Sequence, residues 1–131
     1  MTADSKYLHS DTTHKILQGF FTVCRQLPFG LPVTAYKKAL AIELANLGLL
    51  ISADQDVILQ YAQQTIGSLP LDLLVDNQIV LMIISEDTIL PAHETAMKNR
   101  LRMSKYEVGL ILNFGIEGQH KRLVYTNDLK K

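Results

Sequence analysis

One carboxylate, Asp72, lies inside the strongly apolar segment Leu69–Ile84, whose sequence is L-P-L-D-L-L-V-D-N-Q-I-V-L-M-I-I. A carboxylate can help to hold Mg²⁺, a hard cation that binds oxygen ligands, but such a site needs further polar groups beside Asp72. The alternative is a structural carboxylate paired with a Lys, a His or a backbone N–H, because burying an unpaired charge is costly. We favour the structural interpretation.

Three other sets of residues carry weaker signals of chemistry. His93 and Glu94 are adjacent, so on a helix they point in different directions and form no metal-binding pair. His9 and His14 lie too far apart for a recognised ligand spacing. Cys24 lies on an apolar stripe, where a cysteine usually acts as a small hydrophobic residue. We expect structural or surface roles for all five residues.

Basic residues gather toward the end of the sequence. Residues 1–90 hold five Lys/Arg and nine Asp/Glu, a balance of −4, and residues 91–131 hold eight and four, a balance of +4. Lys98, Arg102 and Lys105 follow i, i+4, i+7 spacing, which predicts one face of a helix, with Arg100 nearby. Such a set usually forms a solvated helix face, and the alternative interpretation is a weak contact to a nucleic-acid phosphate backbone. No interleaved aromatic residues support the nucleic-acid interpretation.

Length and composition limit the class of protein. The 131 residues, 47% of them apolar, suit one folded domain that spans 1–131 and buries a sizeable core without disulfides. No apolar run approaches the roughly 20 residues that cross a bilayer, and the polar N-terminus does not resemble a signal peptide. The single cysteine leaves no disulfide framework. We therefore expect a cytoplasmic protein.

Periodicity predicts two helices at the start of the chain. Asp11 is the expected cap of the first, whose apolar stripe continues to Leu27. Pro28 and Gly30 break that helix. Pro32 suits the first turn of the second, which stops at Gly48.

The remainder of the chain predicts a mixed sheet. We expect strands at 57–62, 69–75, 79–84, 108–114 and 122–125, turns at 63–68, 76–78 and 115–120, and a helix at 91–103. The first three strands should form an antiparallel meander, and the helix should carry the chain to a parallel strand. The ends, 1–10 and 127–131, are expected to be frayed. The fold class is α/β in the order ααβββαβ, with helices flanking the sheet.

Six short segments, in this order and spacing, carry a resemblance to a known family. They are Lys15-Ile16, Gly30–Tyr36, Ala39–Leu44, Asp72–Val75, His93-Glu94 and Val108–Gly115. The chain resembles, from about Ser10 to Tyr125, the GxxExxY family of small PD-(D/E)XK nuclease-like proteins. The resemblance implies a restriction-endonuclease-like core.

It also implies where catalytic residues would lie. Nucleases of this class need a carboxylate on the second core strand, then an acid and a lysine two residues apart on the third. Two carboxylates hold Mg²⁺, the metal activates water, and the lysine orients or stabilises the nucleophile. Asp72 matches the first carboxylate. Met82 occupies the position of the second acid, and Ile84 that of the lysine.

The helical positions of the family pattern depart in the same way. Gly30 and Tyr36 keep the glycine and tyrosine of the naming motif, but Val33 stands in place of its glutamate, and Ala96 aligns with a frequent glutamine. Four of five functional positions have lost their polar group, and thioether or aliphatic carbons do not bind Mg²⁺. These departures imply that Asp72 is vestigial, with no catalytic or metal site and no cofactor.

The favoured hypothesis is therefore a catalytically inactive nuclease-like domain that acts as a protein-binding or assembly module. Its former cleft would be lined by Val33, Met82, Ile84 and Ala96, and would be a partner site if open and core if closed. Self-association through this recess or through an exposed strand edge is expected to be feasible.

Two alternatives remain open. The first is a Mg²⁺- or Mn²⁺-dependent nuclease that uses Asp72 with relocated Glu94 and Lys98. Glu86 and Asp87 lie past the predicted strand end, where a solvated loop that favours the next helix N-terminus is the simpler interpretation. The second alternative is a nucleic-acid binder without cleavage, which would use the basic set Lys98, Arg102 and Lys105.

Overall fold

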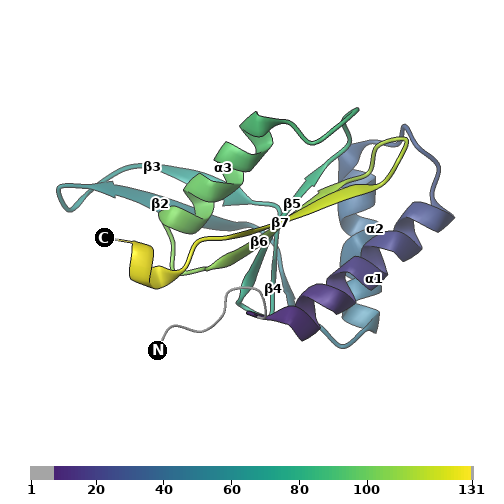
Figure 1. The fold of residues 1–131 in the computed structure, drawn as a ribbon, viewed down its shortest axis with the longest axis horizontal. Helices are drawn as coiled ribbons and strands as arrows, with labels where there is room; N and C mark the ends of the chain where they lie inside the picture. Colours follow the sequence, from purple (N-terminus) through teal and green to yellow (C-terminus); the bar gives the residue numbers. More distant parts are fainter. Residues whose placement is uncertain (1–7, 131) are drawn as a thin grey trace.

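The structure is a computed structural model that describes residues 8–130 of the chain (Figure 1). Three α-helices and seven strands follow one another along this range. The helices are α1 (Ser10–Gln26), α2 (Val33–Asn46) and α3 (Pro91–Arg102). The strands are β1 (Ile51–Ser52), β2 (Gln55–Tyr61), β3 (Gln64–Leu71), β4 (Leu73–Val75), β5 (Ile79–Ile84), β6 (Val108–Asn113) and β7 (Gln119–Val124).

Five of the strands form one mixed sheet in the order β1-β4-β5-β6-β7. The pair β5 and β6 is parallel, with Leu81 beside Leu110, and the other three pairs are antiparallel. Helix α3 carries the chain from β5 to β6, as a parallel connection requires. The predicted α/β class with a mixed sheet flanked by helices is confirmed, as is the parallel strand that follows the helix.

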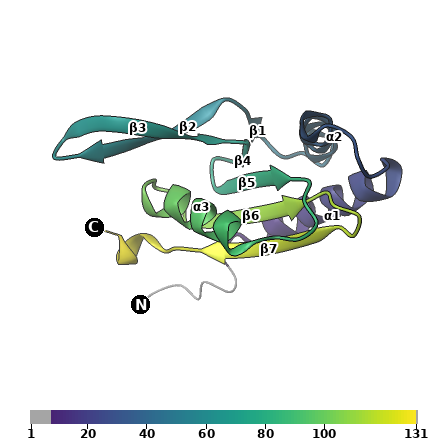
Figure 2. The same cartoon turned by 90° about the horizontal axis from the view of Figure 1, so that it is seen from above.

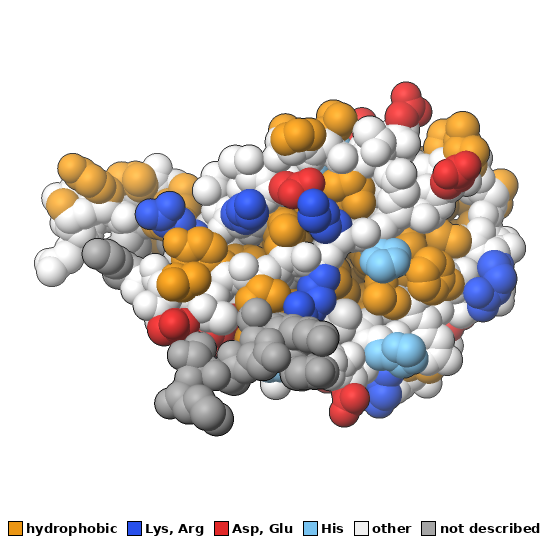
Figure 3. All heavy atoms as spheres, viewed as in Figure 1, with side chains coloured by type: hydrophobic (Ala, Val, Ile, Leu, Met, Phe, Trp, Pro, Cys, Tyr) orange, Lys and Arg blue, Asp and Glu red, His pale blue; other side chains and the backbone are white. Residues whose placement is uncertain are grey.

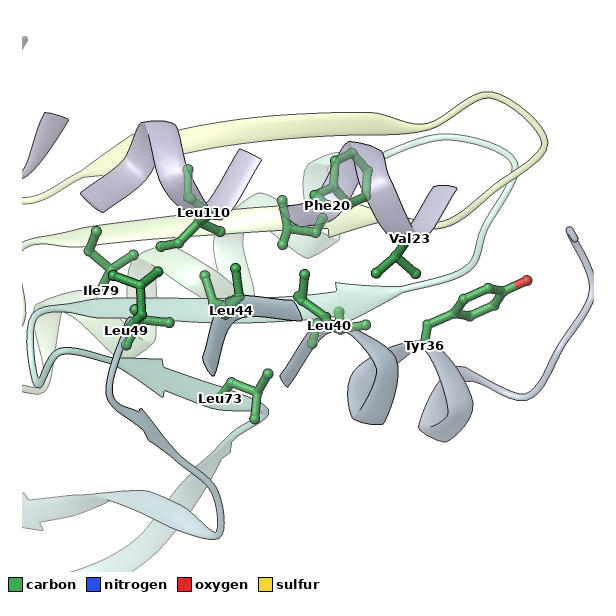
Figure 4. Close-up of a cluster of buried hydrophobic side chains, with 14 of the residues drawn as sticks. Phe20, Val23, Tyr36, Leu40, Leu44, Leu49, Leu73, Ile79 and Leu110 are labelled. Carbon is green, nitrogen blue, oxygen red and sulfur yellow. The ribbon is translucent and has the colours of Figure 1, made fainter. Parts of the chain in front are cut away.

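Both faces of the sheet are covered, which explains why β5 and β6 are almost entirely apolar. Helices α1 and α2 pack on one face and α3 on the other (Figure 2). The core on the first face joins the two helices to alternate strand residues (Figure 4). Its helical members are Ile16, Phe20, Val23, Tyr36, Leu40 and Leu44, and its strand members include Leu73, Ile79, Leu81 and Leu110.

The expected three-strand meander is wrong. Strands β2 and β3 form a separate two-stranded sheet, and the segment expected as one strand over 69–75 is divided at Asp72 between β3 and β4. The turn of the hairpin consists of Ala62 and Gln63, with φ of 49° and 65°, rather than 63–68. Neither is the glycine or asparagine that marks such turns in a sequence. Gly67 instead lies inside β3.

The ends of the chain also differ from expectation. Helix α1 starts at Ser10 with His9 as the N-cap residue, φ 55°, so Asp11 lies in the first turn and is not the cap. Residues 1–7 and 131 of the expected frayed ends lie outside the described residues. The tail Asn127–Leu129 forms a 3₁₀ turn. After it, Lys130 Nζ donates to the carbonyl oxygens of Ser104 at 3.0 Å and Tyr106 at 2.6 Å.

Within residues 8–130, the helices lack the combination of length and apolar composition that crossing a membrane requires.

Candidate functional site

The loop between α1 and α2 shapes one wall of the site, and Tyr36 fixes that loop. The Tyr36 hydroxyl donates to the Pro28 carbonyl and accepts the N–H of Leu31 at 3.1 Å. Its ring stacks on Phe114, with centroids 4.8 Å apart and planes 6° from parallel. Gly30, at the tip, has φ 99°, which a side chain would disfavour. Tyr36 therefore has a structural role that positions the start of α2.

Asp72 lies where β3 passes into β4, and its side chain completes the edge of β5. Asp72 Oδ2 accepts the backbone N–H of Ile83 at 2.7 Å. Strand β4 begins at Leu73, which pairs with Leu81, so the strand ladder ends before it reaches Ile83. The carboxylate thus replaces the backbone carbonyl that a longer β4 would supply. This is a structural pairing with a backbone N–H.

The predicted cleft region is open, and two recesses there share Val33 and Ile83. The smaller, of about 120 Å³, is lined by Val33, Thr34, Lys37, Asp72 and Ile83. The larger, of about 450 Å³, is lined by Phe29, Gly30, Leu31, Val33, Ile83, Ile84, Ser85 and Glu86. Val33 is 42% exposed and Phe29 54% exposed. Apolar groups therefore face solvent in the recess that Asp72 lines and in the larger recess next to it.

Of the four residues expected to line the cleft, Val33 and Ile84 line the larger recess, and Met82 and Ala96 line neither recess. Met82 and Ile84 are both partly buried and pack against the core under α3, which includes Met97 and Leu101. Ala96 lies on α3, partly buried, and its carbonyl accepts a hydrogen bond from Arg100. The polar residues of the smaller recess are Asp72, whose carboxylate is already bonded to an N–H, together with Thr34 and Lys37, so the recess offers one carboxylate beside an ammonium group. These residues do not fit Mg²⁺.

The relocated set of the nuclease alternative is not brought together. Glu94 Oε1 lies 3.0 Å from Lys121 Nζ on β7, and Lys98 is exposed on α3. Three strand spacings separate β7 from β4, about 14 Å, and Asp72 directly precedes β4. A metal ion held by Asp72 would therefore lie far from the Glu94 carboxylate.

Lys37, which sequence reasoning did not single out, and Glu86, which it placed in a solvated loop past the strand end, lie closer. Lys37 lines the smaller recess with Asp72, and Glu86 lines the larger one. Lys37 follows Val33 by one helical turn, and this i, i+4 spacing was the available signal. Asp87 is exposed in the loop after β5.

A buried asparagine holds the rim of the larger recess. Asn113 is fully buried; its Oδ1 accepts the Glu86 N–H at 2.9 Å, and its Nδ2 donates to the Glu86 carbonyl at 3.0 Å. Ser85 Oγ donates to the Phe114 carbonyl at 2.9 Å. A Cβ on Gly115 would overlap the Glu86 carbonyl oxygen, so only glycine allows this close approach. The one polar residue in the apolar strand 108–114 was the signal for this clamp.

The basic set differs from its predicted arrangement. Lys98 and Arg102 are exposed on α3, but the helix ends at Arg102, so Lys105 does not continue their face. Lys105 Nζ instead lies 5.7 Å from the centre of the Tyr106 ring. Arg100 is occupied, since its Nε donates to the Pro70 carbonyl at 2.9 Å.

The other candidates have local roles. His93 Nδ1 accepts the Leu90 N–H at 2.9 Å, which satisfies a free donor at the start of α3. Burial raises the pKa of the Cys24 thiol, and nearby Arg25 lowers it by less. The His9 carbonyl accepts the Thr13 N–H at 2.9 Å. Among residues 8–130, no group of three His, Cys, Asp or Glu side chains is arranged to hold a metal ion.

Comparisons with known proteins give one match. Neither the comparison with curated proteins nor the one with solved structures returned a match. The family model of the PD-(D/E)XK nuclease superfamily matches residues 10–123, from the start of α1 almost to the end of β7. The match covers most of the sequence and all five strands of the mixed sheet, with helices on both faces. The chain therefore belongs to the PD-(D/E)XK nuclease superfamily.

Proposed function

We propose that this chain is a catalytically inactive, GxxExxY-type member of the superfamily that acts as a protein-binding or assembly module. The observation that carries the proposal is the recess at the former metal position. Exposed Val33 and Phe29 lie beside Ile83 there, and the single matching carboxylate, Asp72, is bonded to a backbone N–H. An exposed apolar recess with polar residues at its margin is typical of a protein contact surface.

The polar groups present suit partner recognition better than hydrolysis. Lys37 and Glu86 lie at the two recesses on either side of Val33, so a partner residue that inserts an apolar side chain would find charged groups at the rim. Interfaces have this arrangement, an apolar centre with a polar margin. Mg²⁺-dependent cleavage would instead need two carboxylates on one ion, and Asp72 and Glu86 line different recesses.

The decisive measurement is metal binding with cleavage. Purified full-length chain is titrated with Mn²⁺ and Mg²⁺ by calorimetry and then incubated with single- and double-stranded DNA and RNA. We expect neither metal binding at Asp72 nor metal-dependent cutting. Cutting that is abolished by Asp72→Asn would overturn the proposal, because the carboxylate would then be a metal ligand rather than a partner of the Ile83 N–H.

A gain-of-function variant calibrates this result. Val33 and Asp72 line the same small recess. Val33→Glu therefore puts a second carboxylate into the recess that Asp72 lines, and we expect it to acquire Mn²⁺ binding that Val33→Gln lacks. The comparison shows that the assay detects a weakly bound ion at this position.

Partner binding is tested at the recess itself. Tagged full-length chain recovers its partners from the native cell, and Val33→Glu should abolish recovery of a specific partner. Ile42→Lys is the matched control, since Ile42 is also an exposed apolar residue of α2, 63% exposed, but does not line either recess. Equal loss in both variants, or in neither, would contradict a role for the recess.

A non-cleaving nucleic-acid binder is the second candidate. Exposed Lys98 and Arg102 lie one turn apart on α3, which favours a contact with two phosphates.

A further inference from the structure

Strands β2 and β3 form an arm that stands apart from the central sheet. This hairpin arm, Gln55–Leu71, runs beside α3 and extends past it, on the side of the molecule away from α1 and α2 (Figures 1 and 2). Its base is anchored by Val57 and Leu71, which are buried in the core under α3, and by the Arg100 bond to Pro70. Beyond the base the strands are largely exposed. Two-stranded sheets are marginally stable in water, so such an arm gains by finding a further strand.

The arm is unusually free of charge. From Val57 to Leu71 the sequence V-I-L-Q-Y-A-Q-Q-T-I-G-S-L-P-L contains no Asp, Glu, Lys or Arg. Ile58, Tyr61 and Ile66 are 49%, 73% and 65% exposed. Hydrophobic side chains are visible along the arm in the space-filling view (Figure 3). Soluble proteins usually place charges on exposed strands to prevent pairing with other chains, and this arm lacks that protection.

The two edges of the arm are not equivalent. On β3, Pro70 has no N–H and its carbonyl is bonded to Arg100, so this edge is blocked near the base. On β2, one edge pairs with β3, and the other has no strand neighbour within residues 8–130. The outward N–H and C=O groups of β2 therefore form an available template for a new strand.

We propose that two copies of this chain pair through the free edge of β2, antiparallel, about a two-fold axis at Ile58. Ile58 is the middle residue of the seven in Gln55–Tyr61. The pairing places Ile58 opposite the partner's Ile58. Val57 of each copy lies opposite Leu59 of the other copy, on the other face of the sheet from Ile58. The two hairpins then form one four-stranded antiparallel sheet. The inference specifies the assembly part of the proposed function and rests on it.

The charge pattern of β2 favours a second copy over an unrelated strand. The one charged residue of β2, Asp56, would lie opposite the partner's Gln60, so no like charges meet. The two Asp56 side chains would be about 14 Å apart along the strands, beyond the screening length of about 8 Å at physiological salt. The chain also has a formal net charge of zero, so two copies do not repel each other at long range.

A charge change at Gln60 tests the register directly. Gln60 is exposed and makes only a long contact, 3.5 Å, to Thr65 in the structure. In the proposed dimer, Gln60→Lys creates two Lys–Asp56 pairs, and Gln60→Glu creates two like-charge pairs. We expect the dimer Kd to fall by about 2- to 30-fold in the first variant and to rise by a similar factor in the second. Sedimentation equilibrium of the full chain measures both, and the difference should shrink at high salt.

A second pair of variants tests the axis. Ile58→Lys places two ammonium groups against each other and should give a monomer. Ile66→Lys replaces another exposed isoleucine of the same hairpin, 65% exposed against 49% for Ile58, but Ile66 is the extra residue of the β-bulge on β3, away from the pairing edge. This control should keep the dimer, and circular dichroism confirms that both variants fold.

The outcomes separate this inference from the proposed function. A dimer that responds as described at both Gln60 and Ile58 supports β2 pairing. A chain that is monomeric at its highest soluble concentration overturns β2 pairing. A dimer whose Kd is unchanged by the Gln60 and Ile58 substitutions overturns it as well. A dimer broken only by Val33→Glu overturns the hairpin interface while supporting the recess, whose partner capture is measured independently.

Discussion

Asp72 and Ile83 are joined by a hydrogen bond of 2.7 Å, in which a carboxylate oxygen accepts a strand N–H that no backbone carbonyl reaches. In a metal-dependent enzyme this oxygen would be free to bind the ion. Here it serves the sheet, and the partial exposure of Asp72 lets water share in solvating it. The edge of β5 and the smaller recess therefore share the Asp72 side chain.

Asp72→Ala should destabilise the fold because it removes the acceptor of the Ile83 N–H. The expected loss in the free energy of unfolding is about 1 kcal/mol, at the low end for an unsatisfied donor because Asp72 is partly exposed. Asp72→Asn keeps an acceptor oxygen and should lose less. Urea unfolding of the three proteins checks this, and equal stability of the alanine variant and the wild type would contradict it.

Asn113→Ala should destabilise the fold more than Asp72→Ala does, because the buried Asn113 side chain bonds both the N–H and the carbonyl of Glu86. We expect a loss of about 2–4 kcal/mol in the free energy of unfolding. Ser85→Ala is the control, since it removes one partly buried bond to the Phe114 carbonyl and should cost about 1 kcal/mol. Hydrogen exchange should also show the Glu86 N–H opening faster in the asparagine variant. A loss no greater than that of the control would show that the clamp is dispensable.

Gly115→Ala tests the close approach of two backbone segments at the rim. The new Cβ would overlap the Glu86 carbonyl, which is held by Asn113 and cannot shift freely. We expect a loss of about 1–3 kcal/mol, as for other overpacked positions. Gly67→Ala is the matched control, because its Cβ would lie at an ordinary 3.7 Å from Leu59 Cδ1. Thermal unfolding that ranks the two variants in the reverse order would be inconsistent with this geometry.

Cys24 gives a pH dependence with a definite sign. Burial raises the pKa of its thiol, so the folded chain resists ionisation that the unfolded chain allows. Its effect on stability should therefore be absent below the ordinary thiol pKa of about 8.5 and destabilising as the pH rises above it. Cys24→Ser should remove that part of the alkaline loss. Alkylation of native Cys24 slower than that of the unfolded chain at pH 8 is the accompanying observation, and equal rates would contradict it.

Lys98 and Arg102 give the test of nucleic-acid binding. If the inactive protein-binding module is correct, the double variant Lys98→Glu with Arg102→Glu should leave any affinity for DNA or RNA unchanged. Fluorescence anisotropy at two salt concentrations measures it. A salt-dependent affinity that the double variant abolishes, but Lys105→Glu leaves intact, would instead support the phosphate-binding alternative, because Lys105 lies beyond the end of α3.

Hydrophobic periodicity predicted the elements whose burial decides their conformation. The apolar stripe and the Pro/Gly breaks located α1 and α2 to within one or two residues, and the unbroken apolar runs located β5 and β6. Strand β1 has only two residues, which no pattern reveals, yet it supplies the neighbour of β4. The hairpin arm was misplaced because its turn uses Ala62 and Gln63 at positive φ, a conformation that their side chains do not signal.

The candidate site was predictable in composition but not in shape. The apolar character of Val33, Met82 and Ile84 can be read directly from the sequence. Whether the cleft is filled depends on how far Tyr36 and Phe114 hold the loop before α2 from the end of β5, a tertiary relationship with no local signal. Lys37 was missed although its i, i+4 spacing from Val33 placed it on the same face of α2, because its proximity to Asp72 depends on how α2 packs beside a distant segment.

The position of β6 has a consequence for synthesis on the ribosome. This strand lies between β5 and β7, is fully buried, and is separated from β5 in the chain by residues 85–107. A nascent chain therefore exposes the apolar run of β5 until residues 108–113 have left the ribosome. Until then, α1 and α2 also lack the β6 residues, such as Leu110, that complete their core. We expect this interval to be the period of greatest exposure to chaperones and to misassociation.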